Sequence, residues 1–231
     1  ADYVMANPPF NQKEWWDGSF ENDERWKYGT PPKNNANFAW LQHMLHHLAP
    51  NGSMGLLLAN GSMSSMSGGE AEIRKSLIEN DLVEVMLAFP GQLFTNTQIP
   101  ACIWFLTNNK KSRGEFRDRS GEVLFLDVRS KGHMVSRVQK VLSDEDIQDI
   151  ACTVRKWRRP DEFEDQLGYC KSISVDEIRN SDYVLTPGRF VGIEDIQLSS
   201  EDYHTQMETL TAKLAEQFNQ AEELETLIRQ N

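Results

Sequence analysis

The sequence is poor in cysteine and has no long hydrophobic run. Its 231 residues include only Cys102, Cys152 and Cys170, an odd number at wide spacing with no CxxC pair. This pattern excludes a disulfide framework and the common zinc sites, so we expect core cysteines in a reducing cytoplasm. No apolar run approaches the roughly 18 residues that a membrane span needs, and the first residues do not resemble a signal peptide. We therefore expect a cytoplasmic protein with no membrane partner.

Positive charge is also scarce. The chain has 24 Lys and Arg against 35 Asp and Glu, a net charge of -11. Because basic side chains supply most nonspecific affinity for nucleic acid, the chain as a whole is not expected to bind nucleic acid alone. Basic residues gather in two local clusters, 110–119 and 155–159, and for both a solvated loop face is favoured over a binding patch.

Strand-like and helix-like segments alternate along the chain. Apolar runs typical of buried strands cover 3–6, 53–60, 82–89, 99–106 and 123–128, of which 123–128 is expected to be the last strand. Helical spacing covers 36–49, 70–80, 141–158 and 173–179. Ser174 is a good candidate for the cap of the last of these helices. The alternation predicts an α/β fold with a mostly parallel sheet and flanking helices.

The C-terminal segment has a different pattern. From Tyr203 onward there is no Gly or Pro, and a seam of residues recurs at intervals of three and four: Met207, Leu210, Leu214, Gln217, Ala221, Leu224 and Ile228. This spacing predicts a long coiled-coil-like helix, which either packs on its own domain or pairs with another chain. We expect three parts: a catalytic half at 1–130, a mixed helical extension at 131–198 and this helix at 199–231.

The first strand runs directly into Asn7-Pro8-Pro9-Phe10. In open α/β sheets, ligands bind beyond the carboxyl ends of the strands, where this tetrapeptide is expected. Each proline fixes its own φ and holds the residue before it in an extended conformation, so the turn is stiff. It presents the Asn7 amide and the Pro8 carbonyl side by side, and Pro9 keeps the turn rigid.

These groups suit an exocyclic amine on a flat ring. The Asn7 amide oxygen and the Pro8 carbonyl are two acceptors for its two N–H bonds, and Phe10 can stack on the ring. The N6 amine of adenine is a poor nucleophile because its lone pair is delocalised into the ring. Two such hydrogen bonds would favour the pyramidal nitrogen that attacks a methyl donor, and a base in a duplex would first have to be flipped out. A plain strand-to-loop turn is the alternative.

Several other residues are candidates for a lesser role. Trp26 and Tyr28, in a polar and aromatic loop at 11–35, either shape the entrance for the base or pack within the loop. Phe94 is either a second contact to the base or a core residue. His43 and His47 have the spacing of zinc ligands but lack an HExxH pattern, so we expect solvent-facing histidines and no metal. Gly68-Gly69 lacks the strand and helix context of a cofactor loop and is interpreted as a turn.

The tetrapeptide and three longer stretches resemble a known family. The stretches are "ERWKYGTPPKNNANFAWLQHMLHHLAPNGSMGLLLANGSM", "IRKSLIENDLVEVMLAFPGQLFTNTQIPACIWFL" and "ISVDEIRNSDYVLTPGRFV". Together they resemble the modification subunit of type I restriction-modification systems, an N6-adenine DNA methyltransferase, from residue 1 to about 192. The resemblance implies a Rossmann-like fold and methyl transfer from S-adenosyl-L-methionine (SAM) to adenine N6. It also implies a specificity subunit that would contact the C-terminal helix, a restriction subunit, and DNA bound through the complex.

One departure from the family is large. Members carry a Gly-rich SAM loop before the tetrapeptide, and no such loop is present here, so we expect the SAM loop to lie upstream of Ala1 and the isolated chain to be inactive. Two alternatives stay open. One is an amino methyltransferase that acts on RNA or on a glutamine side chain of a protein. The other is an assembly fragment that docks onto a specificity subunit and catalyses nothing.

Overall fold

Contacts between residues divide the chain into two units, Ala1–Ile193 and Glu194–Asn231, which are described separately. The structure is a computed structural model. It describes residues 1–94, 98–160, 163–192, 207, 209–218 and 220–221.

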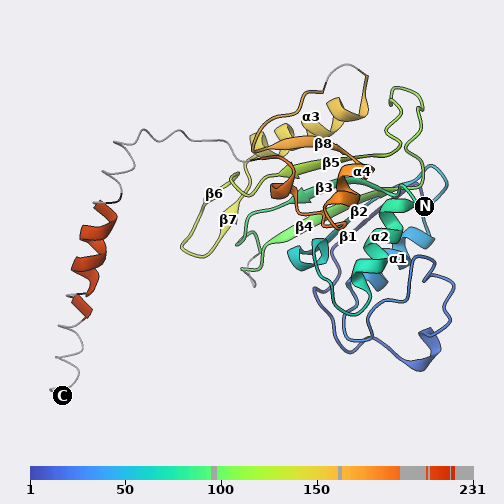
Figure 1. Ribbon diagram of the computed structural model, residues 1–231, viewed down its shortest axis with the longest axis horizontal. Helices are drawn as coiled ribbons and strands as arrows, with labels where there is room; N and C mark the ends of the chain where they lie inside the picture. Colours follow the sequence, from blue (N-terminus) through green and yellow to red (C-terminus); the bar gives the residue numbers. More distant parts are fainter. Residues whose placement is uncertain (95–97, 161–162, 193–206, 208, 219, 222–231) are drawn as a thin grey trace. The chain divides into compact units, whose positions relative to one another are not determined.

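The first unit is built on a six-stranded sheet with the order β1-β2-β4-β3-β5-β8 (Figure 1). The strands are β1 (Tyr3–Ala6), β2 (Ser53–Ala59), β3 (Val83–Ala88), β4 (Ala101–Thr107), β5 (Glu122–Asp127) and β8 (Cys170–Ser174). β1, β2, β3 and β5 run in one direction, and β4 and β8 run against them. Most of the strands thus share one direction, which confirms the predicted α/β fold with a mostly parallel sheet.

Two strands depart from the prediction. β4 is antiparallel to both of its neighbours, because the described residues of the connection from β3 contain no crossover helix and an antiparallel partner needs none. Segment 123–128 is not the last strand, since β8 pairs with β5 beyond it. The predicted helix at 173–179 therefore starts too early: Ile173 is buried in β8, and Ser174 ends that strand and caps the helix that follows. This strand lies in the segment expected to be a helical extension.

Four helices flank the sheet: α1 (Asn37–His46), α2 (Glu70–Glu79), α3 (Asp144–Arg158) and α4 (Val175–Asn180). α3 and α4 begin with capping boxes, in which Ser143 and Ser174 accept hydrogen bonds from the third helical N–H. α3 starts at Asp144 rather than at 141, because Lys140–Val141 forms a strand, β7, that pairs with β6 (His133–Met134). No helix among the described residues is long and apolar enough to cross a membrane.

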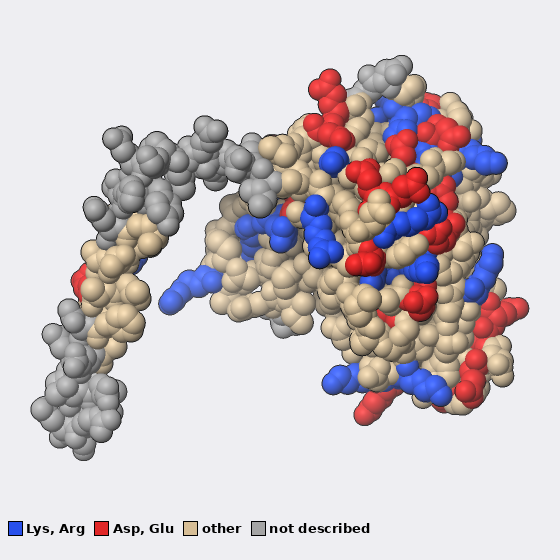
Figure 2. Space-filling view, in the orientation of Figure 1, with Lys and Arg blue, Asp and Glu red and all other residues tan. Residues whose placement is uncertain are grey.

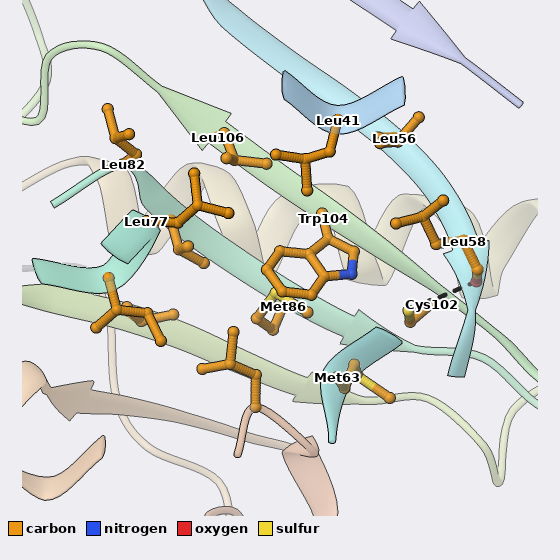
Figure 3. Packing of buried hydrophobic residues seen from close by; sticks show 14 of the residues in the cluster. Leu41, Leu56, Leu58, Met63, Leu77, Leu82, Met86, Cys102, Trp104 and Leu106 are labelled. Carbon is orange, nitrogen blue, oxygen red and sulfur yellow. Dashed lines mark hydrogen bonds between the residues drawn. The ribbon is translucent and has the colours of Figure 1, made fainter. Parts of the chain in front are cut away.

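The main core lies between one face of the sheet and α1, α2 and α4. Trp104 of β4 is fully buried at its centre, against Leu41 of α1 and Leu77 of α2 (Figure 3). The Trp104 indole N–H donates to the Ser62 hydroxyl at 3.0 Å, so burial of this ring leaves no polar group unpaired. This core holds the strands in place, and the carboxyl ends of β1, β2, β3 and β5 lie along one edge of the sheet.

Among the described residues of the first unit, the second face of the sheet is covered at one end only. α3 packs Trp157 onto β3, β5 and β8, where its indole N–H donates to the Ser172 hydroxyl at 2.8 Å. At the β1 end, Tyr3 and Met5 are 83% and 90% exposed. β1 is thus an edge strand with one face packed on the main core and the other open to solvent.

Two expectations from composition are corrected. Cys102 and Cys170 are core residues as predicted, but Cys152 is exposed on α3. The basic clusters are not simply solvated faces: Lys110 and Arg119 are each 3% exposed, and Arg119 pairs with the buried carboxylate of Glu84. Glu84 interrupts the apolar run of β3. Its charge is balanced by Arg119, which lies in a loop to which the sequence analysis assigned no helix or strand.

The second unit contains a helix over the residues described there, which are Met207, 209–218 and 220–221. Within it, Leu210, Leu214 and Phe218 are exposed apolar side chains. These described residues are helical, and the coiled-coil-like seam stays a prediction. Leu224 and Ile228 of the seam lie outside the described residues.

Candidate functional site

The Asn7-Pro8-Pro9-Phe10 segment lies where the sequence predicts, directly beyond the carboxyl end of β1. Asn7 is exposed, and its side-chain amide makes no hydrogen bond to any described residue. Pro8 is buried, so the backbone on one side of the turn is fixed by packing as well as by its ring. A stiff turn therefore presents an amide whose hydrogen-bonding capacity is free for a ligand.

Phe94 lies against Phe10. The two rings meet edge to face, with centroids 5.9 Å apart and planes at 89°. Phe94 comes from the connection between β3 and β4 and is half-buried, so it is not a core residue. Of the two roles predicted for Phe94, a contact to the base or a core residue, its position beside the tetrapeptide favours the first. Phe10 and Phe94 together are called the aromatic corner.

Three asparagines fix the loop that follows Phe10, and the sequence analysis did not select them. The backbone N–H of Asn11 donates to Asn37 Oδ1 at 3.0 Å, and Asn37 Nδ2 donates back to Asn11 Oδ1 at 2.9 Å. Asn35 Oδ1 accepts from the Asn37 backbone N–H at 3.0 Å. Asn37 is 2% exposed at the start of α1, so a buried asparagine ties the turn to the helix. The signal in the sequence was the asparagine-rich stretch NNAN, which runs into the first residue of that helix.

Trp26 lies in a different aromatic group from Phe10. Its indole N–H donates to the Phe20 carbonyl at 2.7 Å, and the Arg25 guanidinium lies 5.1 Å from its ring centroid. Trp26 lines a cavity of about 370 Å³, between this loop and α1, together with Trp15, Phe20, Arg25 and Trp40. Gln12, two residues beyond Phe10 in the chain, also lines this cavity.

Tyr28 lies apart from both aromatic groups. Its ring packs against the main core, and its backbone N–H donates to Gln42 Oε1 at 3.0 Å. Gln42 is 1% exposed and also donates to the Gly29 carbonyl at 2.7 Å. This arrangement fits a packed loop, the alternative that the sequence left open for Tyr28.

The histidines of α1 form no metal cluster with other residues. His43 Nδ1 lies 2.9 Å from the Arg25 guanidinium, and burial, then the nearby His47 and Arg25, lowers the pKa of His43. His43 is half-buried rather than solvent-facing. Within the described part of the chain, no group of three or more His, Cys, Asp or Glu side chains is placed to hold a metal.

Gly68 and Gly69 form the turn that opens α2. Their φ values are +60° and +85°, in the left-handed region that glycine adopts without strain, and Gly69 is the N-cap. A Cβ on Gly68 would lie 3.0 Å from the Pro32 side chain, so the pair also allows the 11–35 loop to approach closely. The interpretation of these glycines as a turn agrees with the structure.

The comparison with known families decides the classification. A family model described as N-6 DNA methylase matches residues 1–199. The chain belongs to this family. The match spans the tetrapeptide, the aromatic corner and the whole described part of the sheet.

Curated relatives agree with this assignment. The chain is 55% identical over 230 residues to the type I restriction enzyme HindI methylase subunit of Haemophilus influenzae, covering 100% of this chain and 50% of that protein. It is 36% identical to the MjaIX methylase subunit of Methanocaldococcus jannaschii, covering 99% of this chain and 41% of that protein. The chain therefore spans about half the length of the curated relatives that it matches.

Solved structures show the same fold. The type I restriction-modification methyltransferase subunit of Streptococcus thermophilus superposes with a TM-score of 0.70 at 29% identity, over 81% of this chain and 37% of that one. The EcoKI M protein superposes with a TM-score of 0.59 at 16% identity, over 92% of this chain and 48% of that one, a likeness in fold.

Proposed function

We propose that this chain is the catalytic portion of a type I restriction-modification methylase subunit that transfers a methyl group from SAM to adenine N6 in DNA. The observation that carries the proposal is the free amide of Asn7 at the carboxyl end of β1, beside the Phe10–Phe94 corner, in a chain of the N-6 DNA methylase family. The match to type I methylase subunits supports the choice of DNA as substrate.

The residues of the site act by binding and orientation. Asn7 Oδ1 and the Pro8 carbonyl accept the two N–H bonds of the adenine amine, which favours a pyramidal nitrogen with its lone pair directed away from the ring. Phe10 stacks on the flipped base, and stacking of this kind is worth about 1–3 kcal/mol per base. Phe94 supports Phe10 edge-on, and the Asn11–Asn37 pair holds the loop in place.

SAM supplies an electrophilic methyl group when bound. The groups described here fit the amine that receives the methyl, and none of them is assigned to SAM. β1 is the edge of the sheet, and the chain spans about half of its relatives. We propose that the Gly-rich SAM loop belongs to the other half, so that these 231 residues alone are inactive and bind SAM weakly. Calorimetry that showed micromolar SAM binding to this chain would refute that part.

Two partner proteins complete the proposal. A specificity subunit would bind the helix of the second unit, whose exposed Leu210, Leu214 and Phe218 need an apolar partner surface. A restriction subunit would join for cleavage. The test is deletion of 203–231 from the full-length subunit, followed by co-purification with the specificity subunit. A complex that survives the deletion would remove the docking role of this helix.

The experiment for the activity uses the full-length gene. It is expressed together with the neighbouring specificity gene, and N6-methyladenine is mapped in the host DNA, with Asn7→Ala as the inactive control. We expect methylated adenines in one bipartite sequence for the wild type and none for Asn7→Ala. An exposed asparagine away from the site, Asn80→Ala, is the matched control and should methylate normally.

The alternatives make different predictions in the same experiment. An expressed wild type that binds SAM but leaves DNA unmethylated would favour an RNA or protein-glutamine substrate, to be sought by mass spectrometry of both pools. A subunit that co-purifies with its partner but methylates neither DNA, RNA nor protein would support a role in assembly alone.

A further inference from the structure

A short hairpin, β6–β7, differs in charge from the rest of this acidic chain. Segment 128–143 contains no Asp or Glu but contains four basic residues, Arg129, Lys131, Arg137 and Lys140, whereas the whole chain has a net charge of -11. Figure 2 shows Lys and Arg side chains, with few acidic ones, on the visible face around β6 and β7. The proposed function gives this local basic surface no role.

The tip of the hairpin is apolar and exposed. Met134, Val135 and Val138 are 47%, 54% and 57% exposed. Single exposed apolar residues are common on protein surfaces, but three at one tip beside basic residues form a patch that favours a partner. Cations and apolar side chains together suit the grooves of DNA, which offer phosphates and base surfaces side by side.

The tip has a defined conformation. The Val135 N–H donates to the Gln139 carbonyl at 3.0 Å, and the Ser136 hydroxyl accepts from the N–H groups of Val138 and Gln139 at 3.3 and 3.1 Å. Gly132, with φ +83°, opens the hairpin where a Cβ would lie 2.7 Å from the carbonyl oxygen opposite. These bonds hold the apolar side chains on a preformed ribbon.

Two of the cations are free for a ligand. Neither Arg137 nor Lys140 forms an ion pair with any residue that the structure describes, and the nearest polar contact of Lys140 Nζ is a backbone carbonyl at 3.5 Å. Lys131 differs, because Asp149 pairs with it at 2.7 Å. Arg137 and Lys140 are therefore the residues whose charge a phosphate would neutralise.

The hairpin lies at the same end of the sheet as the tetrapeptide. It follows β5, whose carboxyl end lies at the same edge of the sheet as that of β1, because the two strands run in the same direction. The Lys140 backbone N–H donates to the Gln92 carbonyl at 2.9 Å. Two residues further on, Phe94 contacts Phe10. One short loop thus joins the base of the hairpin to the aromatic corner.

We propose that the β6–β7 hairpin binds DNA beside the flipped adenine, with Arg137 and Lys140 on backbone phosphates and the apolar tip, Met134, Val135 and Val138, in the groove. The inference rests on the proposed function for the identity of the DNA. The link to the aromatic corner favours DNA over a membrane or a protein partner, because a duplex that delivers a base to Phe10 has to pass this edge of the sheet.

The charge test uses the full-length subunit in complex with its specificity subunit. Arg137→Gln/Lys140→Gln is compared with Arg155→Gln/Lys156→Gln, which removes the same charge from exposed positions on α3. DNA binding is measured from 50 to 200 mM salt. Each phosphate contact contributes about 0.9 to the slope of log affinity against log salt, so the hairpin variant should have a slope shallower by about 2 and a raised KM for DNA. The α3 variant should match the wild type.

A second pair of variants tests the tip. Val135→Ser/Val138→Ser keeps the charge of the hairpin and replaces two exposed apolar side chains by polar ones. With 2-aminopurine at the target position, this variant should give a smaller rise in fluorescence on binding, because the wedge that supports the extruded base is weakened. SAM affinity should be unchanged in all variants.

The outcomes separate the two proposals. Normal methylation with salt slopes and fluorescence equal to wild type in both hairpin variants would overturn the role of the hairpin and leave the proposed function standing. Absence of DNA methylation in the wild type would refute the proposed function. The salt titration would still decide the hairpin: equal slopes for the hairpin and α3 variants would overturn it, and a shallower slope for the hairpin variant alone would support it.

Discussion

Replacing Glu84 by glutamine would leave two arginines without the carboxylate that they share. Glu84 lies in β3 and is 1% exposed. Its Oε1 accepts from Arg119 Nε at 3.2 Å, and its Oε2 accepts from Arg158 Nη2 at 2.6 Å. Arg119 is 3% exposed, so the substitution leaves a cation that water cannot solvate. Loss of one partner from a buried ion pair costs about 3–5 kcal/mol.

The expected shift is large enough to measure by urea unfolding. With a slope of about 2 kcal/mol per M of urea, the midpoint should fall by about 1.5–2.5 M. Glu115→Gln is the matched control, because the Glu115–Arg159 pair is mostly exposed and such pairs contribute about 0–1 kcal/mol. Equal urea midpoints for the two variants would refute the reasoning that burial of the ion pair, rather than the ion pair itself, determines the loss of unfolding free energy.

Three further outcomes are expected. Asn37→Ala leaves the Asn11 backbone N–H unpaired, so the free energy of unfolding in urea should fall by about 1–3 kcal/mol, and methylation by the full-length subunit should slow. The Arg179 guanidinium lowers the pKa of Glu79 to about 2. Stability from this pair is therefore present above the unfolded pKa of about 4.3 and lost as the pH falls toward 2, and Glu79→Gln should flatten thermal melting temperatures across that window. Cys152 alone should react with a thiol reagent at neutral pH in the folded chain, since burial raises the pKa of the other two cysteines to about 12 and about 11; rapid modification of a second thiol would contradict the packing.

The strands of this fold could be located from sequence because buried strands are short apolar runs. β2 and β3 lie within one or two residues of their predicted limits. β8 was missed because its sequence, CKSIS, has apolar residues only at Cys170 and Ile173, so it forms neither an apolar run nor an alternating pattern, and it leads directly into a helix cap. Its strand conformation depends on pairing with β5, which lies more than 40 residues earlier in the chain. The direction of β4 likewise depends on the strands with which it pairs rather than on its own residues.

In the candidate site too, some features follow from local sequence and others depend on contacts between distant segments. Asn7 through Phe10 could be selected from sequence because two prolines fix the turn locally. The contact between Phe94 and Phe10 joins segments 84 residues apart, so no local pattern encodes it. Trp26 and Tyr28 could not be assigned to the base entrance or to packing, because both readings fit an aromatic loop.

The sequence by itself determined the stiff turn at the end of β1, the alternating elements and the Ser174 cap of α4. Each depends on residues within a few positions of one another, where ring constraints, side-chain period and hydrogen bonds to the nearest backbone groups act. The tertiary structure decided the strand order, the burial of Glu84 between two arginines and the position of the basic hairpin near the aromatic corner. These depend on which distant segments share one core, and the free energy of that packing belongs to the whole chain rather than to any local stretch.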